Sequence, residues 1–259
     1  MLKRLFSRTA QKAAPPPTTG GALIYAIGDV HGRLDLLDPL IAKIRADARS
    51  LSADLRPVII FVGDYVDRGP DSRGVVDSIL ALARDPGLEV RALKGNHEEQ
   101  LLLFMSDPNA GPAWAAFGGA ETLSSYGAPR PAARTDVAAW EEVRQAFCER
   151  LPADHRAFFE SLELAVICGD YIFVHAGVRP GIPLNQQSER DLLWIRDDFL
   201  SALEPFEKVV VHGHTPEAEP HDGRNRIGID TGAYATATLT AVRLYGDQRL
   251  FLQTRAQDR

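Results

Sequence analysis

Histidine, aspartate and asparagine side chains lie next to glycine in five short segments of this chain. The segments are Gly28-Asp29-Val30-His31-Gly32, Gly63-Asp64-Tyr65-Val66-Asp67-Arg68-Gly69, Gly95-Asn96-His97-Glu98, Val174-His175-Ala176-Gly177 and His212-Gly213-His214-Thr215. Imidazole, carboxylate and amide donors together suit Mn, Fe or Zn in a mixed nitrogen and oxygen site. Two adjacent divalent ions need one bridging carboxylate and open positions for water and substrate. The segments therefore predict a dinuclear metal site that activates water for hydrolysis.

The candidate metal ligands are three oxygen donors and three imidazoles: Asp29, Asp64 and Asn96, with His31, His175 and His214. Asp29 and His31 project from one loop, whose flanking glycines allow the backbone to turn sharply. The single carboxylate of Asp64 is placed to bridge two ions. The two cysteines, Cys148 and Cys168, have no ligand spacing, so a thiolate-bound structural zinc is not expected. Two scattered thiols also fit a reducing compartment such as the cytoplasm.

Three buried strands are expected to carry the first three segments at their carboxyl ends. Short apolar runs predict strands at residues 22–27, 57–62 and 88–93. Apolar residues at helical spacing predict helices at 34–49 and 72–84 between them. This β-α-β-α-β order implies parallel pairing, and ligands of such sheets bind beyond the carboxyl ends of the strands. The polar strand-end residues should therefore meet at one edge of the sheet.

The middle of the chain has a helical pattern broken by stretches rich in glycine and proline. We expect a helical insertion at about residues 100–162, beside the site. Further strands are predicted at residues 164–167, 171–174, 209–211, 227–229, 236–245 and 250–253. We expect residues 22–255 to form a single domain of the α/β class.

The overall charge argues against a nucleic-acid-binding protein. The formal net charge is −6 and the isoelectric point is about 5.7, whereas nucleic-acid binders usually present a basic face. An acidic protein can still hold a phosphate through local metal ions and arginines. No apolar run reaches the roughly 18 residues that a membrane span needs. The basic, proline-rich residues 1–21 lack the apolar region of a secretory signal, and we expect them to be a disordered leader.

The first three segments resemble the GDxHG, GDxxDRG and GNHE signature of the calcineurin-like metallophosphoesterases. Within this family they resemble the serine/threonine phosphoprotein phosphatase branch, which includes the lambda phage phosphatase. The resemblance runs from about Leu23 to Tyr245, and the two later histidine segments follow in order. It implies a β-sandwich of two mixed sheets flanked by helices. It also implies hydrolysis of phosphomonoesters, above all phosphoserine and phosphothreonine in proteins, by direct attack of a metal-bridging hydroxide.

The resemblance also assigns roles to the ligands and to the groups around them. Asp29 and His31 resemble ligands of the first metal, Asp64 the bridge, and Asn96, His175 and His214 ligands of the second. His97 resembles the general acid and Asp67 the carboxylate that orients it. Arg68 resembles a phosphate clamp, and the segment Leu193-Trp194-Ile195-Arg196 resembles one that carries a second phosphate-binding arginine. Asn96 should also contact the phosphate. We expect two divalent ions, with Mn as the first choice and Fe or Zn as alternatives.

Several nearby residues receive more modest interpretations. His212 is interpreted as structural, because Pro216 departs from the G-H-x-H pattern that uses both histidines. Glu98 should begin a helix and could reach Arg68, whereas Asp230 could either support the site or only form a turn. We expect His155 and His221 to be solvated. Four aromatic residues of the insertion are expected to pack internally: Trp114, Phe117, Trp140 and Phe147.

Two other functions stay open. One is hydrolysis of a dinucleoside polyphosphate such as diadenosine tetraphosphate, by a related bacterial branch that tends to carry GNHD and a residue other than Asp in the second motif. Asp67 and Glu98 favour the protein phosphatase branch, although the fold alone does not fix the substrate. The other is an inactive metal-binding scaffold. The expected substrate is therefore a phosphoprotein or a phosphorylated small molecule.

Overall fold

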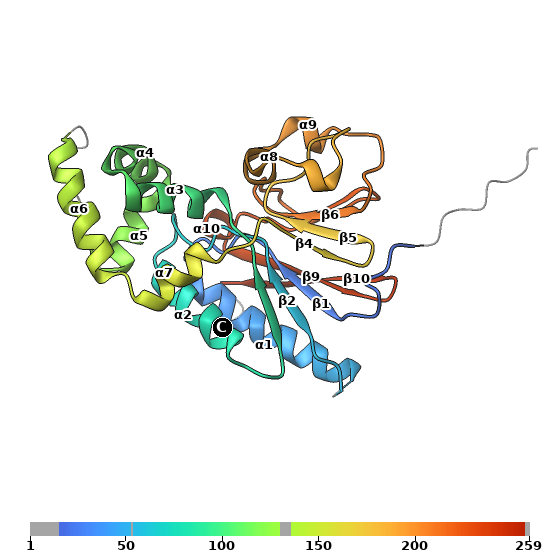
Figure 1. The fold of residues 1–259 in the computed structure, drawn as a ribbon. Coiled ribbons are helices and arrows are strands. Elements are labelled where there is room, and N and C mark those ends of the chain that lie inside the picture. Colours follow the sequence, from blue (N-terminus) through green and yellow to red (C-terminus); the bar gives the residue numbers. More distant parts are fainter. Residues whose placement is uncertain (1–15, 53, 130–135, 257–259) are drawn as a thin grey trace, which may run out of the picture.

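Two five-stranded sheets pack face to face at the centre of the molecule (Figure 1). The structure, a computed structural model, describes residues 16–52, 54–129 and 136–256. The first sheet has the strand order β10-β9-β1-β2-β3 and the second β4-β5-β6-β8-β7. Side chains of both sheets, such as Ala26 and Phe173, share one buried cluster between them. The predicted α/β sandwich of two mixed sheets is confirmed.

The first sheet contains the three predicted parallel strands and closes with an antiparallel pair. Its strands are β1 (Ile24–Ile27), β2 (Val58–Phe61), β3 (Glu89–Ala92), β9 (Thr238–Tyr245) and β10 (Gln248–Arg255). Helices α1 (Leu34–Leu51) and α2 (Ser72–Ala83) connect the parallel strands. Along β1, Tyr25 faces these helices while Ala26 faces the second sheet. Both faces are buried, which explains why the strand is a continuous apolar run.

The second sheet follows the helical insertion. Its strands are β4 (Ala165–Cys168), β5 (Tyr171–Val174), β6 (Val209–His212), β7 (His221–Asp222) and β8 (Arg226–Gly228). Short helices lie between β5 and β6, namely η3 (Leu184–Gln186), α8 (Glu189–Trp194) and α9 (Asp197–Leu200), and α10 (Ala233–Thr236) follows β8. Strands β5, β6 and β8 are parallel, so their carboxyl ends also share one edge.

The insertion consists of helices that pack around an aromatic cluster. They are α3 (Asn96–Ser106), η1 (Pro108–Ala110), α4 (Gly111–Trp114), the π-helical turn η2 (Ala115–Gly119), α5 (Ala120–Ser125), α6 (Val137–Arg150) and α7 (Ala153–Glu160). Trp114, Trp140 and Phe147 are buried, as predicted. The prediction for Phe117 was wrong, because its side chain is 69% exposed. The positive φ of Gly118, 114°, interrupts the helical geometry next to it.

The prediction that His155 is solvated was also wrong. Its ring is buried, with Nδ1 2.8 Å from the hydroxyl of Tyr126 and Nε2 3.0 Å from Oδ1 of Asp77. These contacts join α7 to α2 and to the end of α5. The side chain of His221 is half-buried.

Residues 1–15 of the expected leader lie outside the described residues. The residues that follow lie against the turn between β4 and β5. The amide of Thr18 donates to Oδ2 of Asp170 at 2.9 Å, and its carbonyl accepts from the amide of Asp170 at 2.8 Å. Within the described ranges, no helix is both long and apolar enough to cross a bilayer.

Candidate dinuclear metal site

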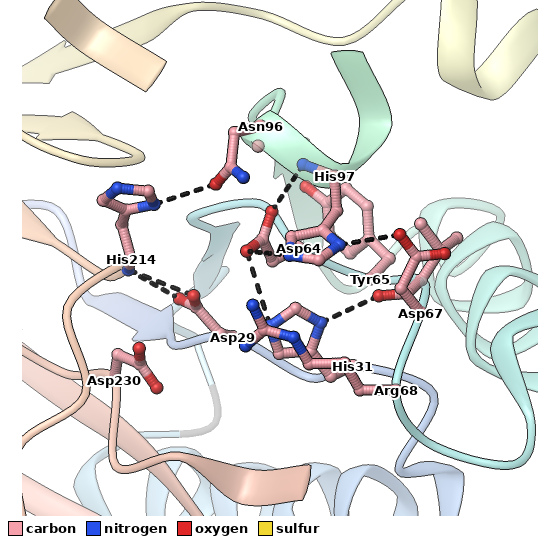
Figure 2. A network of polar contacts seen from close by, with 12 residues as sticks. Asp29, His31, Asp64, Tyr65, Asp67, Arg68, Asn96, His97, His214 and Asp230 are labelled. Atoms are coloured by element: carbon pink, nitrogen blue, oxygen red, sulfur yellow. Dashed lines mark hydrogen bonds and ion pairs between the residues drawn. The ribbon is translucent and has the colours of Figure 1, made fainter. Parts of the chain in front are cut away.

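The carboxyl ends of strands from both sheets bring the predicted residues together (Figure 2). Asp29, Asp64 and Asn96 follow β1, β2 and β3, whereas His175 and His214 follow β5 and β6. Five residues of the motifs other than glycine have a positive φ, which costs energy for a residue with a side chain: His31, Asp64, Asp67, Arg68 and His214. Such strain persists only where the surroundings fix the backbone, and it gathers at functional sites.

The carboxylate of Asp64 lies between two groups of histidines. Its Oδ2 is 3.4 Å from Nε2 of His31 and 3.9 Å from Nε2 of His97. Its Oδ1 is 3.5 Å from Nε2 of His175, which is 3.2 Å from Nδ1 of His214. Each group brings its ligand atoms within 4.8 Å of one another. One oxygen therefore faces each group, which is the placement that a bridging carboxylate requires.

In the second group, acceptor atoms of Asn96, His175 and His214 point toward one another. Oδ1 of Asn96 is 2.9 Å from Nε2 of His175 and 2.8 Å from Nδ1 of His214. Nδ1 of His175 donates to the carbonyl of Val62 at 2.9 Å, so its Nε2 carries the lone pair. His31 is held in the same way, because its Nδ1 donates to the carbonyl of Val66 at 2.8 Å. Lone pairs that converge in this way suit a cation.

Burial keeps the ligand histidines neutral. Burial lowers the pKa of His31 to about 3 and that of His175 below its usual value. Burial, followed by the proximity of His175, lowers the pKa of His214 to about 2. Neutral imidazole is the form that binds metal. Three carboxylates, those of Asp29, Asp64 and Asp230, are also buried here, and cations would offset their charge. The residues therefore fit two divalent ions.

Asp29 belongs to neither of the two histidine groups. Its oxygens accept from the backbone amide of His214 at 3.0 and 3.2 Å. Gly213 allows this approach, because a Cβ there would collide with Oδ1 of Asp29. Burial raises the pKa of Asp29 well above its usual value, and Asp230 and Asp64 add to this effect. A positive ion beside Asp29 would favour its ionised form.

Asp230 lies beside Asp29 (Figure 2). Its Oδ1 accepts from the amide of Gly232 at 2.8 Å, which is a turn contact. Burial raises the pKa of Asp230 to about 6. The hydrogen bond from the Gly232 amide opposes this rise, and the charge of Asp64 adds to it. Asp230 thus forms the turn and also adds a carboxylate to the site.

His97 differs from the ligand histidines in its environment. Its Nδ1 is 2.6 Å from Oδ2 of Asp67. Burial alone would lower the pKa of His97, but the negative charges of Asp64 and Asp67 outweigh this effect. The pKa of His97 is therefore raised above its usual value. The ring is therefore the imidazole of the site that favours the protonated form, as a general acid requires.

His212 offers no free nitrogen, since its Nδ1 is 3.0 Å from the carbonyl of Gly213 and its Nε2 3.2 Å from Nη1 of Arg226.

Glu98 holds the loop that carries Asp64. Its Oε2 accepts from the amides of Asp64 and Gly95 at 2.8 and 2.9 Å. Its Oε1 accepts from the amides of Tyr65 and Val66 at 2.8 and 3.3 Å. The expected contact with Arg68 is absent from the hydrogen bonds of the described residues. The shape of this loop thus depends on a buried acid rather than on an ion pair.

Replacing Glu98 by glutamine should destabilise the protein. The NH2 group of glutamine donates and cannot accept, so the buried backbone N–H groups that face it lose their partner at a cost of about 1–3 kcal/mol each. We expect the free energy of unfolding in urea to fall by at least about 2 kcal/mol. Glu160→Gln, on the exposed end of α7, is the matched control. Equal stability of the two variants would contradict the role of Glu98.

Two arginines line a cavity beside His97. Nη1 of Arg68 is 3.2 Å from Nε2 of His31, and its guanidinium lies 4.5 Å from the ring centre of Tyr234. Arg196 is exposed, and its guanidinium makes no hydrogen bond or ion pair within the part of the chain that the structure describes. The cavity, of about 230 Å³, is lined by Arg68, Asn96, His97, Gln100, Ala113, Trp114, Phe117, Trp194 and Arg196. Both arginines can thus reach a phosphate group placed there.

The sequence motifs did not indicate every residue around His97. Trp114 and Thr122 of the insertion contact the carboxylate of Asp67. Neither stands in a recognisable motif, and Trp114 was expected only to pack. Tyr234, which lies over Arg68, was also not anticipated.

Residues 22–244 match the family described as "Calcineurin-like phosphoesterase". A bis(5'-nucleosyl)-tetraphosphatase PrpE (asymmetrical) from Anoxybacillus flavithermus is 27% identical over 85% of this chain and 90% of its own length. Serine/threonine-protein phosphatase 1 of Salmonella typhimurium is 29% identical over 85% of this chain and 91% of its own. A cold-active protein-tyrosine phosphatase structure from a psychrophilic Shewanella has a TM-score of 0.57 at 17% identity, over 93% of this chain and 83% of that one. The structural likeness shows a shared fold.

Proposed function

The chain belongs to the calcineurin-like phosphoesterase family of metal-dependent hydrolases, and we propose that it hydrolyses phosphomonoesters, with phosphoserine and phosphothreonine in proteins as its substrates. The observation that carries this proposal is the position of Asp64, with one oxygen facing each histidine group and the His97–Asp67 pair beside it. Two divalent ions, manganese first among them, would supply an activated water and a Lewis acid here. We further propose a cytoplasmic enzyme with one catalytic domain over residues 22–255.

Residues from five segments of the chain would hold the ions in the proposed site. Asp29, His31 and Asp64 would hold the first ion, and Asp64, Asn96, His175 and His214 the second. Val62 and Val66 fix the rings of His175 and His31 through their carbonyls. Such contacts set the tautomer and the orientation of a ligand histidine.

His97, Asp67 and the arginines would act on the substrate. Arg68 and Arg196 would neutralise the phosphate oxygens, with the amide of Asn96 nearby. As the bond from phosphorus to the leaving oxygen breaks, Nε2 of His97 would give its proton to that oxygen. Asp67, at 2.6 Å from Nδ1, would hold the ring in place and stabilise its protonated form.

A second candidate is the asymmetrical hydrolysis of dinucleoside tetraphosphates. Relatives with this printed name match most of the chain. The structure has a feature that suits a substrate with two ends: an open hollow of about 800 Å³ and the smaller cavity share Arg68 in their linings. Partly exposed aromatic rings lie in both, Tyr234 in the hollow and Phe117 and Trp194 in the cavity. Each could stack on a base.

A substrate panel distinguishes these functions. We would measure kcat/KM with Mn²⁺ for a phosphoserine peptide, a phosphothreonine peptide, p-nitrophenyl phosphate and diadenosine tetraphosphate. We expect the phosphopeptides to have the highest kcat/KM. A higher value for diadenosine tetraphosphate would reject the phosphoprotein proposal in favour of the second candidate. No turnover of any compound, with no metal bound, would instead favour an inactive scaffold.

A further inference from the structure

The carboxylate of Asp67 is surrounded by hydrogen-bond donors from two parts of the chain. Nδ1 of His97 donates to its Oδ2 at 2.6 Å. The other two donors come from the helical insertion: Nε1 of Trp114 donates to Oδ2 at 2.9 Å, and the hydroxyl of Thr122 donates to Oδ1 at 2.6 Å. The exposed fraction of all four side chains is at most 4%. The geometry of the His97–Asp67 pair therefore depends on residues outside the motifs.

The hydroxyls around Asp67 have only one consistent arrangement. Because the hydrogen of Thr122 goes to Oδ1 of Asp67, Ser72 must be the donor across the 3.0 Å between the two hydroxyls. The amide of Asp67 in turn donates to Oγ of Ser72 at 3.1 Å and to Oγ1 of Thr122 at 2.9 Å. Both the backbone and the carboxylate of Asp67 are thus bound to Thr122.

The insertion also fixes the backbone next to Asp67. The amide of Arg68 donates to the carbonyl of Gly118 at 3.1 Å. Asp67 and Arg68 have φ values of 72° and 67°, a conformation that needs support from the surrounding structure. The turn from Trp114 to Thr122 supplies this support to both residues, as the contacts of Gly118 and Thr122 show.

We propose that Trp114 and Thr122 are positioning residues for the general acid. They fix the carboxylate of Asp67, so that the ring of His97 keeps its Nε2 directed at the leaving oxygen. This inference rests on the proposed function, in which His97 gives its proton to that oxygen. The helical insertion then helps to position the general acid. Loss of its contacts with Asp67 should lower the rate most for substrates whose leaving oxygen needs a proton.

A purely structural role for Trp114 makes a different prediction. Its ring stacks on Phe104 with centroids 4.8 Å apart and lies 6.0 Å from that of Phe147, so its loss also weakens packing. A packing defect lowers activity by the same factor for every substrate. A misplaced acid instead slows alkyl phosphates, whose leaving alkoxide needs a proton, much more than p-nitrophenyl phosphate, whose leaving group is stable as an anion.

The test uses the full chain loaded with Mn²⁺ and the variants Trp114→Phe and Thr122→Val. Each removes one donor to Asp67 and keeps most of the side-chain volume. We expect kcat for a phosphoserine peptide to fall about tenfold or more, with less than about a threefold loss for p-nitrophenyl phosphate, since general acids contribute about 10²–10⁴-fold. KM should change little. Thr122→Ser retains the hydroxyl and should restore kcat.

Trp140→Phe is the matched control, because Trp140 packs on Phe104 in the same aromatic cluster. Equal losses on both substrates in Trp114→Phe and Thr122→Val, as in the control, would overturn the inference. Should Trp114→Phe fail to fold, the pair Thr122→Val and Thr122→Ser decides the question. His97→Ala tests the premise separately: if it too shows no dependence on the leaving group, the proposed role of His97 as the general acid fails and not only the inference about Trp114 and Thr122.

Discussion

Replacing His97 by alanine is expected to lower kcat/KM for a phosphoserine peptide by about 10²–10⁴-fold, the range that general acids contribute. The side chain lies in the cavity with Arg68 and Arg196, and its pKa is raised by Asp64 and Asp67 against the effect of burial. It can therefore carry a proton where the leaving oxygen would lie. The loss should be smaller for p-nitrophenyl phosphate, because its leaving group needs no proton.

The measurement is steady-state kinetics with both substrates, after the metal content of each preparation has been matched. His221→Ala is the control, since His221 lies in β7, the edge strand of the second sheet, and belongs to neither histidine group. An unchanged rate in His97→Ala would remove His97 from the mechanism. A uniform loss on both substrates would assign it to binding rather than to proton transfer.

Replacing Asp64 by alanine should abolish both metal binding and activity. The two oxygens of Asp64 face the two histidine groups at 3.4–3.5 Å, so one substitution removes a ligand from each proposed ion. Activity should fall to background, because neither the activated water nor the Lewis acid is then available. Mn²⁺ should be counted by elemental analysis after equilibrium dialysis.

Circular dichroism should show that the Asp64→Ala protein is folded. Asp247→Ala is the charge-matched control, since Asp247 is exposed in the turn between β9 and β10. Two ions per chain retained in Asp64→Ala would reject the assignment of Asp64 as the bridge. Loss of one ion alone would limit Asp64 to a single metal.

The parallel strands were predictable because their sequences are unambiguous. β1 and β2 are buried on both faces, so each is a short apolar run. Each run is followed by glycine and aspartate, which mark its end. Their predicted bounds extend one or two residues beyond the observed Ile24–Ile27 and Val58–Phe61. The edge strand β7 was not predicted, because two residues are too few to show an alternating pattern.

The residues that were missed depend on contacts distant in the sequence. Nothing near His155 indicates that Tyr126 and Asp77 would enclose its ring. Phe117 was placed in the core by its helical surroundings, but the left-handed Gly118 interrupts the helix next to it. Thr122 lies 55 positions after Asp67, and no local pattern could pair them. The motifs therefore indicated the groups with proposed chemical roles, but not the residues that hold these groups in place.

The amount of metal bound by the active protein tests most directly whether this chain is a dinuclear-metal phosphoesterase. The metal-free full chain should be titrated with Mn²⁺ while bound metal and phosphate release from a phosphopeptide are measured on the same samples. We predict that activity appears with binding and saturates at two ions per chain. Full activity in the metal-free protein, or saturation at a single ion, would contradict the account.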